Sequence, residues 1–199
     1  PAAISSLSAL EELDVTGKEG TPGIRGVAAD VFSGLTKLKK LNASNNSFSG
    51  DLSWLKDLSA LQTLRLDGNQ LSGQLDLSQF SPNLTDVYLS NNKLEGNLNG
   101  ISTLTKVRNL YLEHNLLSGE LPAELGNCST LSYFYLSNNN ITGTIPVEVA
   151  KMNLGYSGLK LNGNRMSGEI PAEVLSSAVW KKLYPETNIY PQQEGYGFS

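Results

Sequence analysis

The sequence has few of the residues that build metal centres or covalent cross-links. Among its 199 residues it contains one cysteine, Cys128, and one histidine, His114. A single cysteine cannot form an internal disulfide, and no zinc site can be built from paired cysteines or clustered histidines. The glycine-rich strings that cradle phosphate groups are also missing. We therefore expect neither a metal ion nor a cofactor.

Strong charge of one sign and long apolar runs are absent too. Lys and Arg number 15 against 19 Asp and Glu, which gives a formal net charge of −4. Without a basic stripe the chain has little with which to displace phosphate counterions, so nucleic acid is not an expected partner. No apolar stretch approaches the ~20 residues needed to cross a bilayer, so no transmembrane segment is expected. A lipid anchor, if there is one, would lie outside this chain.

The chain does contain one motif that occurs six times. Each copy has an apolar-x-apolar pair, then an asparagine, and a glycine four residues after the asparagine. Successive asparagines are 23, 23, 23, 24 and 25 residues apart. A nearly constant period of this length predicts a stacked solenoid, in which a binding face is built from columns of residues one repeat apart. The asparagines are Asn46, Asn69, Asn92, Asn115, Asn139 and Asn164.

Within each repeat the residues predict a short strand followed by a turn. Leu64 and Leu66 alternate with polar residues, as in a strand with one buried face. The turn leaves interior backbone groups without ladder partners, and a buried asparagine such as Asn69 can satisfy them because its amide both donates and accepts. We expect the six asparagines to form a ladder through the solenoid. The glycines that follow, such as Gly73, are expected to adopt positive φ or to approach a neighbouring coil closely.

These repeats predict one elongated domain over residues 1–199. A degenerate unit with Lys18 at the ladder position and a loop fill 1–35, the six regular repeats fill 36–175, and a cap and tail fill 176–199. Pro122, Pro146 and Pro171 predict helical turns that begin at the proline. The three earlier repeats lack this proline and are expected to be more extended there.

The end of the chain predicts a cap for the last coil. Residues 172–180 have the pattern of a helix, and an apolar lid over the open edge would prevent aggregation. The tail 192–199 is expected to be loosely held. The expected lid residues are Trp180, Leu183, Tyr184, Ile189 and Tyr190.

The string Leu-Ser-Gly-Glu-Leu-Pro-Ala-Glu-Leu-Gly-Asn-Cys at residues 117–128 resembles the leucine-rich repeat family in its plant-type Leu-x-Gly-x-Ile-Pro subclass. The resemblance covers roughly residues 7–175. It implies an α/β fold: a right-handed horseshoe with a concave parallel β-sheet and an irregular or short-helical convex side. It also implies a non-enzymatic protein that binds proteins, peptides or glycans.

A second, shorter resemblance concerns the origin of the protein. The ending Tyr-Pro-Gln-Gln-Glu-Gly-Tyr-Gly-Phe at 190–198 is similar to that of leucine-rich repeat surface proteins of gut Bacteroidetes. The absence of the paired cap cysteines found in plant receptor ectodomains agrees with it. This resemblance implies an extracellular or cell-surface location, in a bacterial envelope rather than the plant apoplast.

Counting back from each asparagine identifies the outward residue of each strand. This column contains Asp14, Asn42, Arg65, Tyr88, Tyr111, Tyr135 and Lys160. Because strands lie about 4.8 Å apart, the three tyrosines would stand side by side, with Tyr133, Glu113 and His114 near them. Exposed aromatic residues flanked by charges are favoured at interfaces. However, tyrosine also has high strand propensity, so the column could merely stabilise the sheet.

The sequence therefore leaves two functions open. The first is a monomeric binding module that recognises a protein or a glycan through the concave face, by Arg65, Tyr88, Tyr111, Tyr133, Tyr135, Glu113, His114 and Lys160. The second is a rigid spacer or scaffold without a strong ligand. Catalysis is not expected, because His114 and the nearest serines lie on an open face that does not exclude water.

Overall fold

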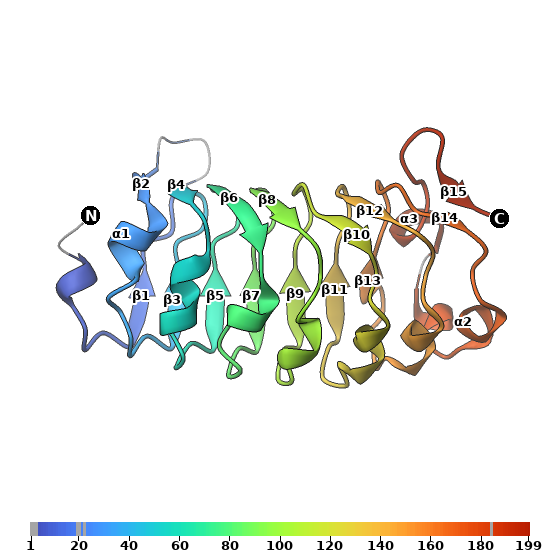
Figure 1. Cartoon of the computed structure of the whole chain (residues 1–199), viewed down its shortest axis with the longest axis horizontal. Coiled ribbons are helices and arrows are strands. Elements are labelled where there is room, and N and C mark those ends of the chain that lie inside the picture. The colour runs from blue at the N-terminus through green and yellow to red at the C-terminus, as the bar shows by residue number, and fades with distance from the viewer. Residues whose placement is uncertain (1–3, 19–20, 22, 184) are drawn as a thin grey trace.

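The computed structural model describes residues 4–18, 21, 23–183 and 185–199. The chain forms an elongated solenoid whose termini lie at opposite ends (Figure 1). Along one side runs a seven-stranded parallel sheet in the order β1-β3-β5-β7-β9-β11-β13. Its strands are β1 (Glu12–Asp14), β3 (Lys40–Asn42), β5 (Thr63–Arg65), β7 (Asp86–Tyr88), β9 (Asn109–Tyr111), β11 (Tyr133–Tyr135) and β13 (Leu159–Lys160).

The register of this sheet aligns the outward column residue by residue. Arg65 pairs with Tyr88, Tyr88 with Tyr111, and Tyr111 with Tyr135. Lys160 continues the column beyond Tyr135. The leucine-rich repeat fold class and its parallel sheet, expected from the repeat, are thus confirmed.

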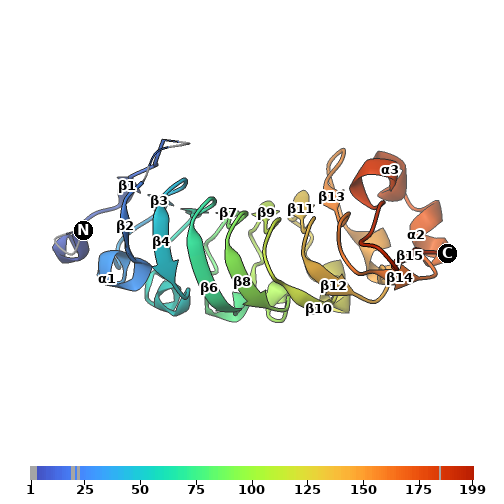
Figure 2. The ribbon, with the colours of Figure 1, turned by 90° about the horizontal axis from the view of Figure 1, so that it is seen from above.

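A second set of short parallel strands, which the sequence reading missed, lies on another side of the coil (Figure 2). Gly73 lies in β6 with φ of +86°, and a Cβ there would come within 3.0 Å of the Asp51 Cβ on the preceding coil. The glycine is therefore needed both for its φ and for close packing. The strands are β2 (Arg25–Val27), β4 (Ser47–Gly50), β6 (Gln70–Leu75) and β8 (Lys93–Gly96), then β10 (Ser118–Glu120) with β12 (Asn140–Thr142), and β14 (Ser167–Gly168) with β15 (Gly197–Phe198).

Short helices complete the coils, with two differences from expectation. Pro122 and Pro146 each precede the first helical residue by one position and keep extended ψ values. The coils without proline also carry 3-10 turns, so only β6 is noticeably more extended. The α-helices are α1 (Ala28–Phe32), α2 (Ala172–Ser176) and α3 (Pro185–Asn188), and the 3-10 helices are Ile4–Ser6, Ser53–Asp57, Leu77–Gln79, Ile101–Thr103, Ala123–Asn127, Val147–Lys151 and Trp180–Lys182.

The asparagines form a regular hydrogen-bonded ladder inside the turns. Asn139 is typical: its Nδ2 donates to the carbonyls of Leu112 and Leu136, 3.0 Å each, and its Oδ1 accepts from the Leu117 amide. The other five repeat this pattern between adjacent coils. The ladder ties each coil to its neighbour through otherwise unpaired backbone groups.

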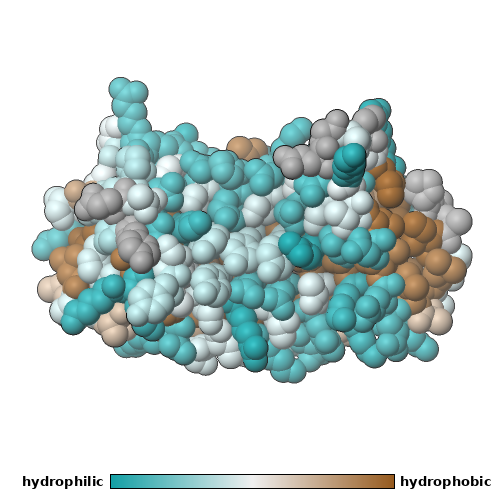
Figure 3. Space-filling view, turned by 180° about the vertical axis from the view of Figure 1, so that it is seen from behind, coloured by the Kyte–Doolittle hydropathy of each residue, from teal (hydrophilic) through white to brown (hydrophobic). Residues whose placement is uncertain are grey.

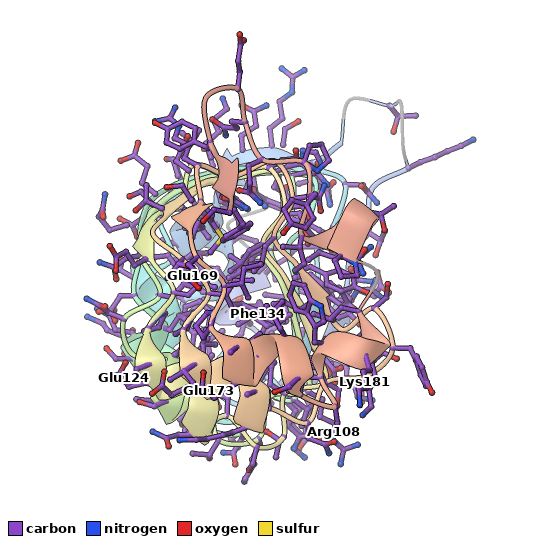
Figure 4. All side chains as sticks on the ribbon, turned by 90° about the vertical axis from the view of Figure 1, so that its right-hand side faces the viewer. Arg108, Glu124, Phe134, Glu169, Glu173 and Lys181 are labelled. Carbon is purple, nitrogen blue, oxygen red and sulfur yellow. The ribbon has the colours of Figure 1, made fainter. Side chains whose placement is uncertain are left out.

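A continuous apolar core fills the coils. Viewed along the solenoid, Phe134 lies in the interior while Arg108, Glu124, Glu173 and Lys181 surround it (Figure 4). Seen from the side of the seven-stranded sheet, apolar surface gathers at the N-terminal end (Figure 3). The exposed apolar residues of that end are Leu7, Ile24 and Val27.

The C-terminal cap differs from the expected one. The helix α2 ends at Ser176 rather than Trp180. Leu183 and Ile189 are buried, while Trp180 and Tyr190 pack against the core in part; Tyr184 lies outside the described residues. The chain then makes an eighth, modified coil in which α3 takes the place of a strand.

The tail is firmly attached, so the prediction of a loose tail is wrong. The Gln192 Nε2 donates to the carbonyls of Leu161 and Ile189, and its Oε1 accepts from the Met166 amide. This is the pattern of a ladder asparagine, made by the longer side chain of glutamine. The strand β15 then pairs with β14.

Replacing Gln192 with alanine is expected to loosen this cap. The change removes the side-chain partner of the Met166 amide and one of the two side-chain donors to the Leu161 carbonyl, which keeps its bond from Asn164. We expect about 1–2 kcal/mol of lost stability and faster hydrogen exchange in the last coil, measured by urea unfolding and exchange mass spectrometry. The neighbouring exposed Glu194→Ala is the control, and equal exchange in both variants would refute the ladder role.

Candidate functional site

Three tyrosines form a continuous row across the middle of the seven-stranded sheet. The ring centroids of Tyr88 and Tyr111 are 4.7 Å apart with planes inclined by 29°, so these rings stack. The Tyr135 ring lies 4.7 Å from that of Tyr111 at 68°, an edge-to-face contact. Here Tyr88, Tyr111 and Tyr135 are called the tyrosine row.

A positively charged side chain packs against the ring at each end of the tyrosine row. The Arg65 Cζ lies 4.3 Å from the Tyr88 ring centroid, and the Lys160 Nζ lies 4.1 Å from that of Tyr135. Such contacts are worth ~0.5–1 kcal/mol at exposed positions. One face of the Tyr88 ring and one face of the Tyr135 ring thus each carry a cation, while Tyr88 also stacks on Tyr111.

The hydroxyls of the tyrosine row make no hydrogen bond to any part of the chain that the structure describes. Burial of the rings raises the pKa of Tyr111 to about 12 and raises the pKa of Tyr88 and Tyr135 in the same direction. All three hydroxyls therefore stay protonated near neutral pH. They are free to donate to a ligand.

The raised pKa of Tyr111 predicts a loss of stability in alkali. The folded state holds this proton more tightly than the unfolded chain, whose tyrosines ionise near pH 10, so its contribution is complete below pH ~10 and is lost towards about pH 12. Urea unfolding just below and above pH ~10 should show a smaller drop for Tyr111→Phe than for the unmodified chain. An equal drop would mean that Tyr111 ionises as in the unfolded chain.

Tyr133 has a different place from the other tyrosines. Its ring stands at 87° to that of Tyr135, with centroids 6.3 Å apart, and it covers the backbone of Gly155. A Cβ at Gly155 would lie 3.0 Å from the Tyr133 Cζ. Tyr133 therefore supports the end of the tyrosine row and packs on the segment before β13.

That segment presents a tyrosine that the sequence reading missed. Tyr156 is 72% exposed and follows Gly155 in a bulge held by hydrogen bonds from the Gly155 amide to the Ser132 carbonyl and from the Ser157 amide to the Lys182 carbonyl. The signal was available: the 25-residue interval before Asn164 is the longest and contains the extra residues. We add Tyr156 to the candidate contact residues.

Glu113 and His114 lie beside the tyrosine row rather than in it. They line a polar groove of 380 Å³ that meets the row at Lys160, with α3 as its end wall. Glu113 accepts from the Ser90 hydroxyl at 2.5 Å, whereas the His114 Nε2 faces the Asn138 amide at 3.2 Å. The serine, the histidine and the acid thus do not form a relay, although they are close in space.

Neither a cluster of metal ligands nor a membrane-spanning helix is present in the described residues. Among residues 4–18, 21, 23–183 and 185–199 no three His, Cys, Asp or Glu side chains gather where they could hold a metal ion. None of the helices in the described part of the chain is long and apolar enough to cross a membrane.

The repeated coil, the parallel sheet and the asparagine ladder define a leucine-rich repeat solenoid. Models of leucine-rich repeats match residues 22–71, 106–128 and 130–152. The sequence comparison thus agrees with the fold.

Among solved structures the chain is similar to plant receptors. It shares 30% identity and a TM-score of 0.77 with the plant peptide hormone receptor RGFR1 in complex with RGF2, over 87% of this chain and 28% of that one. It shares 29% identity and a TM-score of 0.77 with the Arabidopsis receptor kinase HAESA, in complex with the peptide hormone IDA and the co-receptor SERK1, over 92% of this chain and 30% of that one. With PEPR1-AtPEP1 it shares 29% identity and a TM-score of 0.79, over 92% of this chain and 25% of that one. The chain thus spans less than a third of each of these proteins.

Proposed function

We propose that this chain is a non-enzymatic recognition module that binds a protein partner, through an extended peptide segment, along its seven-stranded sheet. The observation that carries the proposal is the tyrosine row with Arg65 and Lys160 at its ends and with hydroxyls that have no hydrogen-bond partner among the described residues. Aromatic residues and arginine dominate the binding energy of protein interfaces. The contact residues would be Arg65, Tyr88, Tyr111, Tyr133, Tyr135, Tyr156, Glu113, His114 and Lys160.

The geometry of the tyrosine row favours a peptide over a glycan. Aromatic recognition of a ligand from above needs an open ring face, but the Tyr88 and Tyr111 faces cover each other and the outer faces carry cations. The exposed ring edges and hydroxyl donors instead suit backbone carbonyls and apolar side chains. A sugar remains the competing ligand, with the polar groove beside Lys160 as its place.

The similar receptors support the same choice. RGFR1 and HAESA are described in complex with RGF2 and with a peptide hormone, respectively, and share the fold over most of this chain. By analogy the chain would work outside the cell or at its surface, and we propose that this domain acts as a monomer. We propose a bacterial envelope as its location from the resemblance of the ending at 190–198 alone, and any lipid anchor would be attached through sequence outside this chain.

The alternative function, a rigid spacer, has one observation in its favour. Stacked tyrosines and cation–π contacts stabilise adjacent strands without any ligand. A spacer, however, gains nothing from three phenols whose hydroxyls have no hydrogen-bond partner among the described residues, since phenylalanine would stack as well.

Selection from a random displayed peptide library, run in parallel with a glycan array, tests the proposal. We expect retained peptides that bind the intact chain and are released by the Tyr88→Ala, Tyr111→Ala variant. If the chain bound glycans but no peptides, the function would be sugar recognition and the proposed peptide ligand would be wrong. Peptides that bind the variant equally well would contradict the proposal by placing the binding site elsewhere. No ligand from either the library or the array would contradict it and favour the spacer.

A further inference from the structure

We propose that the segment bound by the tyrosine row is proline-rich and adopts the polyproline II conformation, lying along the solenoid axis across β7, β9 and β11. This inference rests on the proposed function, because it names the ligand class of the same surface. Two independent features of the row support it. They are the spacing of the tyrosines and the excess of hydrogen-bond donors over acceptors in the row and its flanking cations.

The spacing of the row matches the repeat of a polyproline II helix. Each step between ring centroids is 4.7 Å, so Tyr88 and Tyr135 are separated by at most twice this value, about 9.4 Å. A polyproline II helix has three residues per turn and a rise of ~3.1 Å, so it presents the same face every ~9.3 Å. A β-strand repeats its face every ~6.6 Å, which fits neither one step nor two. Successive turns of the helix would therefore place equivalent carbonyls over Tyr88 and Tyr135.

Every group of the row and both flanking cations can donate towards such a ligand, whereas only the three phenol oxygens can accept. Arg65 and Lys160 carry no acceptor, and the phenols of the row are held protonated without a hydrogen-bond partner among the described residues. The carboxylates beside the row each already accept a hydrogen bond, Glu113 from Ser90, Asp86 from Asn109 and Asp67 from Ser44. A β-strand would bring backbone N–H groups that need acceptors.

A proline-rich segment has the complementary character. Proline has a backbone carbonyl but no N–H, and a polyproline II helix makes no internal hydrogen bonds, so its carbonyls are available. Its pyrrolidine rings can pack on the apolar ring edges that surround the hydroxyls, as in other aromatic-lined peptide sites. The ordering cost is small because the helix is already formed before binding.

The test uses a dye-labelled, end-blocked decaproline. Its length of about 31 Å exceeds the ~19 Å between strand β5, which carries Arg65, and strand β13, which carries Lys160. Fluorescence anisotropy should show saturable binding to the intact chain and none for an equally long Gly-Ser peptide. Each hydroxyl over an equivalent carbonyl contributes about fivefold, so Tyr88→Phe combined with Tyr135→Phe should weaken binding about 25-fold. Tyr111→Phe should cost about twofold, and Tyr196→Phe, on the tail, nothing.

The outcomes separate this inference from the proposed function. No binding of decaproline, or equal losses for Tyr88→Phe, Tyr111→Phe and Tyr135→Phe, overturns the polyproline II assignment. If library-selected peptides without proline then bind in a manner that depends on Tyr111, the proposed function stands and only this inference fails. If no peptide depends on the tyrosine row, both fail. Phenylalanine retains the ring stacking, so these variants are expected to fold.

Discussion

Replacing Asn139 with alanine is expected to lower the free energy of unfolding by about 1–3 kcal/mol, which corresponds to a fall of roughly 2–12 °C in Tm. Asn139 is only 2% exposed. Its loss leaves the buried Leu117 amide without its side-chain partner. It also removes one of the two side-chain donors to each of the Leu112 and Leu136 carbonyls, which keep the bonds from Asn115 and Asn164. Buried polar groups of this kind cost more when unsatisfied than a formed hydrogen bond contributes.

Thermal and urea unfolding of Asn139→Ala measure this effect. The matched control is Asn99→Ala, which removes an exposed amide with no side-chain hydrogen bond to a described residue. The control is expected to stay within about 0.5 kcal/mol of the unmodified chain. If both variants lost the same small amount of stability, the asparagines would not form the ladder on which the coil depends.

The Tyr88→Ala, Tyr111→Ala variant is expected to weaken binding of a library-selected peptide at least about 30-fold while Tm falls by only a few degrees. Central aromatic side chains account for most of the energy of such interfaces, and this variant removes the stacked pair of the row. The stack itself contributes about 0.5–1.5 kcal/mol to the sheet, which the core can tolerate.

Calorimetric titration and a thermal melt of the same sample separate the two roles of the tyrosines. Tyr196→Ala, which removes an exposed tyrosine from the tail, is the control and should change neither quantity. Unfolding of the double variant at room temperature would instead show that the tyrosines serve mainly to hold the sheet together. A folded variant with undiminished affinity would place the binding site elsewhere.

Much of the seven-stranded sheet could be predicted because the repeat has a nearly constant length. Each ladder asparagine fixes the phase of its strand, and strand register is specified wherever one face is buried. Arg65, Tyr88, Tyr111 and Tyr135 therefore fall in one column, as expected from counting alone. Lys160 also falls in it, although the interval before Asn164 is two residues longer.

Counting by the repeat fails where residues are inserted, and where a different side chain makes the hydrogen bonds of a ladder asparagine. Tyr156 lies in inserted residues, so counting gave it no place in a column. Gln192 escaped notice because glutamine, with one more methylene, replaces the asparagine and α3 replaces the strand. Neither the insertion at Tyr156 nor the replacement of asparagine by Gln192 follows the period of the repeat, so neither can be predicted by counting.

Side-chain arrangement within the column also lies beyond the sequence. Spacing places three tyrosines side by side, but only their rotamers decide that ring faces cover each other and that cations close both ends. The same holds for His114, whose imidazole faces Asn138 rather than Ser90. The choice between a peptide and a glycan depends on these rotamers.

The most direct test of the binding role is an NMR titration of the chain, labelled only in its tyrosine rings, with a library-selected peptide. The account predicts saturable shifts of the Tyr88, Tyr111 and Tyr135 ring signals, and no shift of Tyr196. Saturable binding that leaves the signals of the tyrosine row unchanged would contradict it.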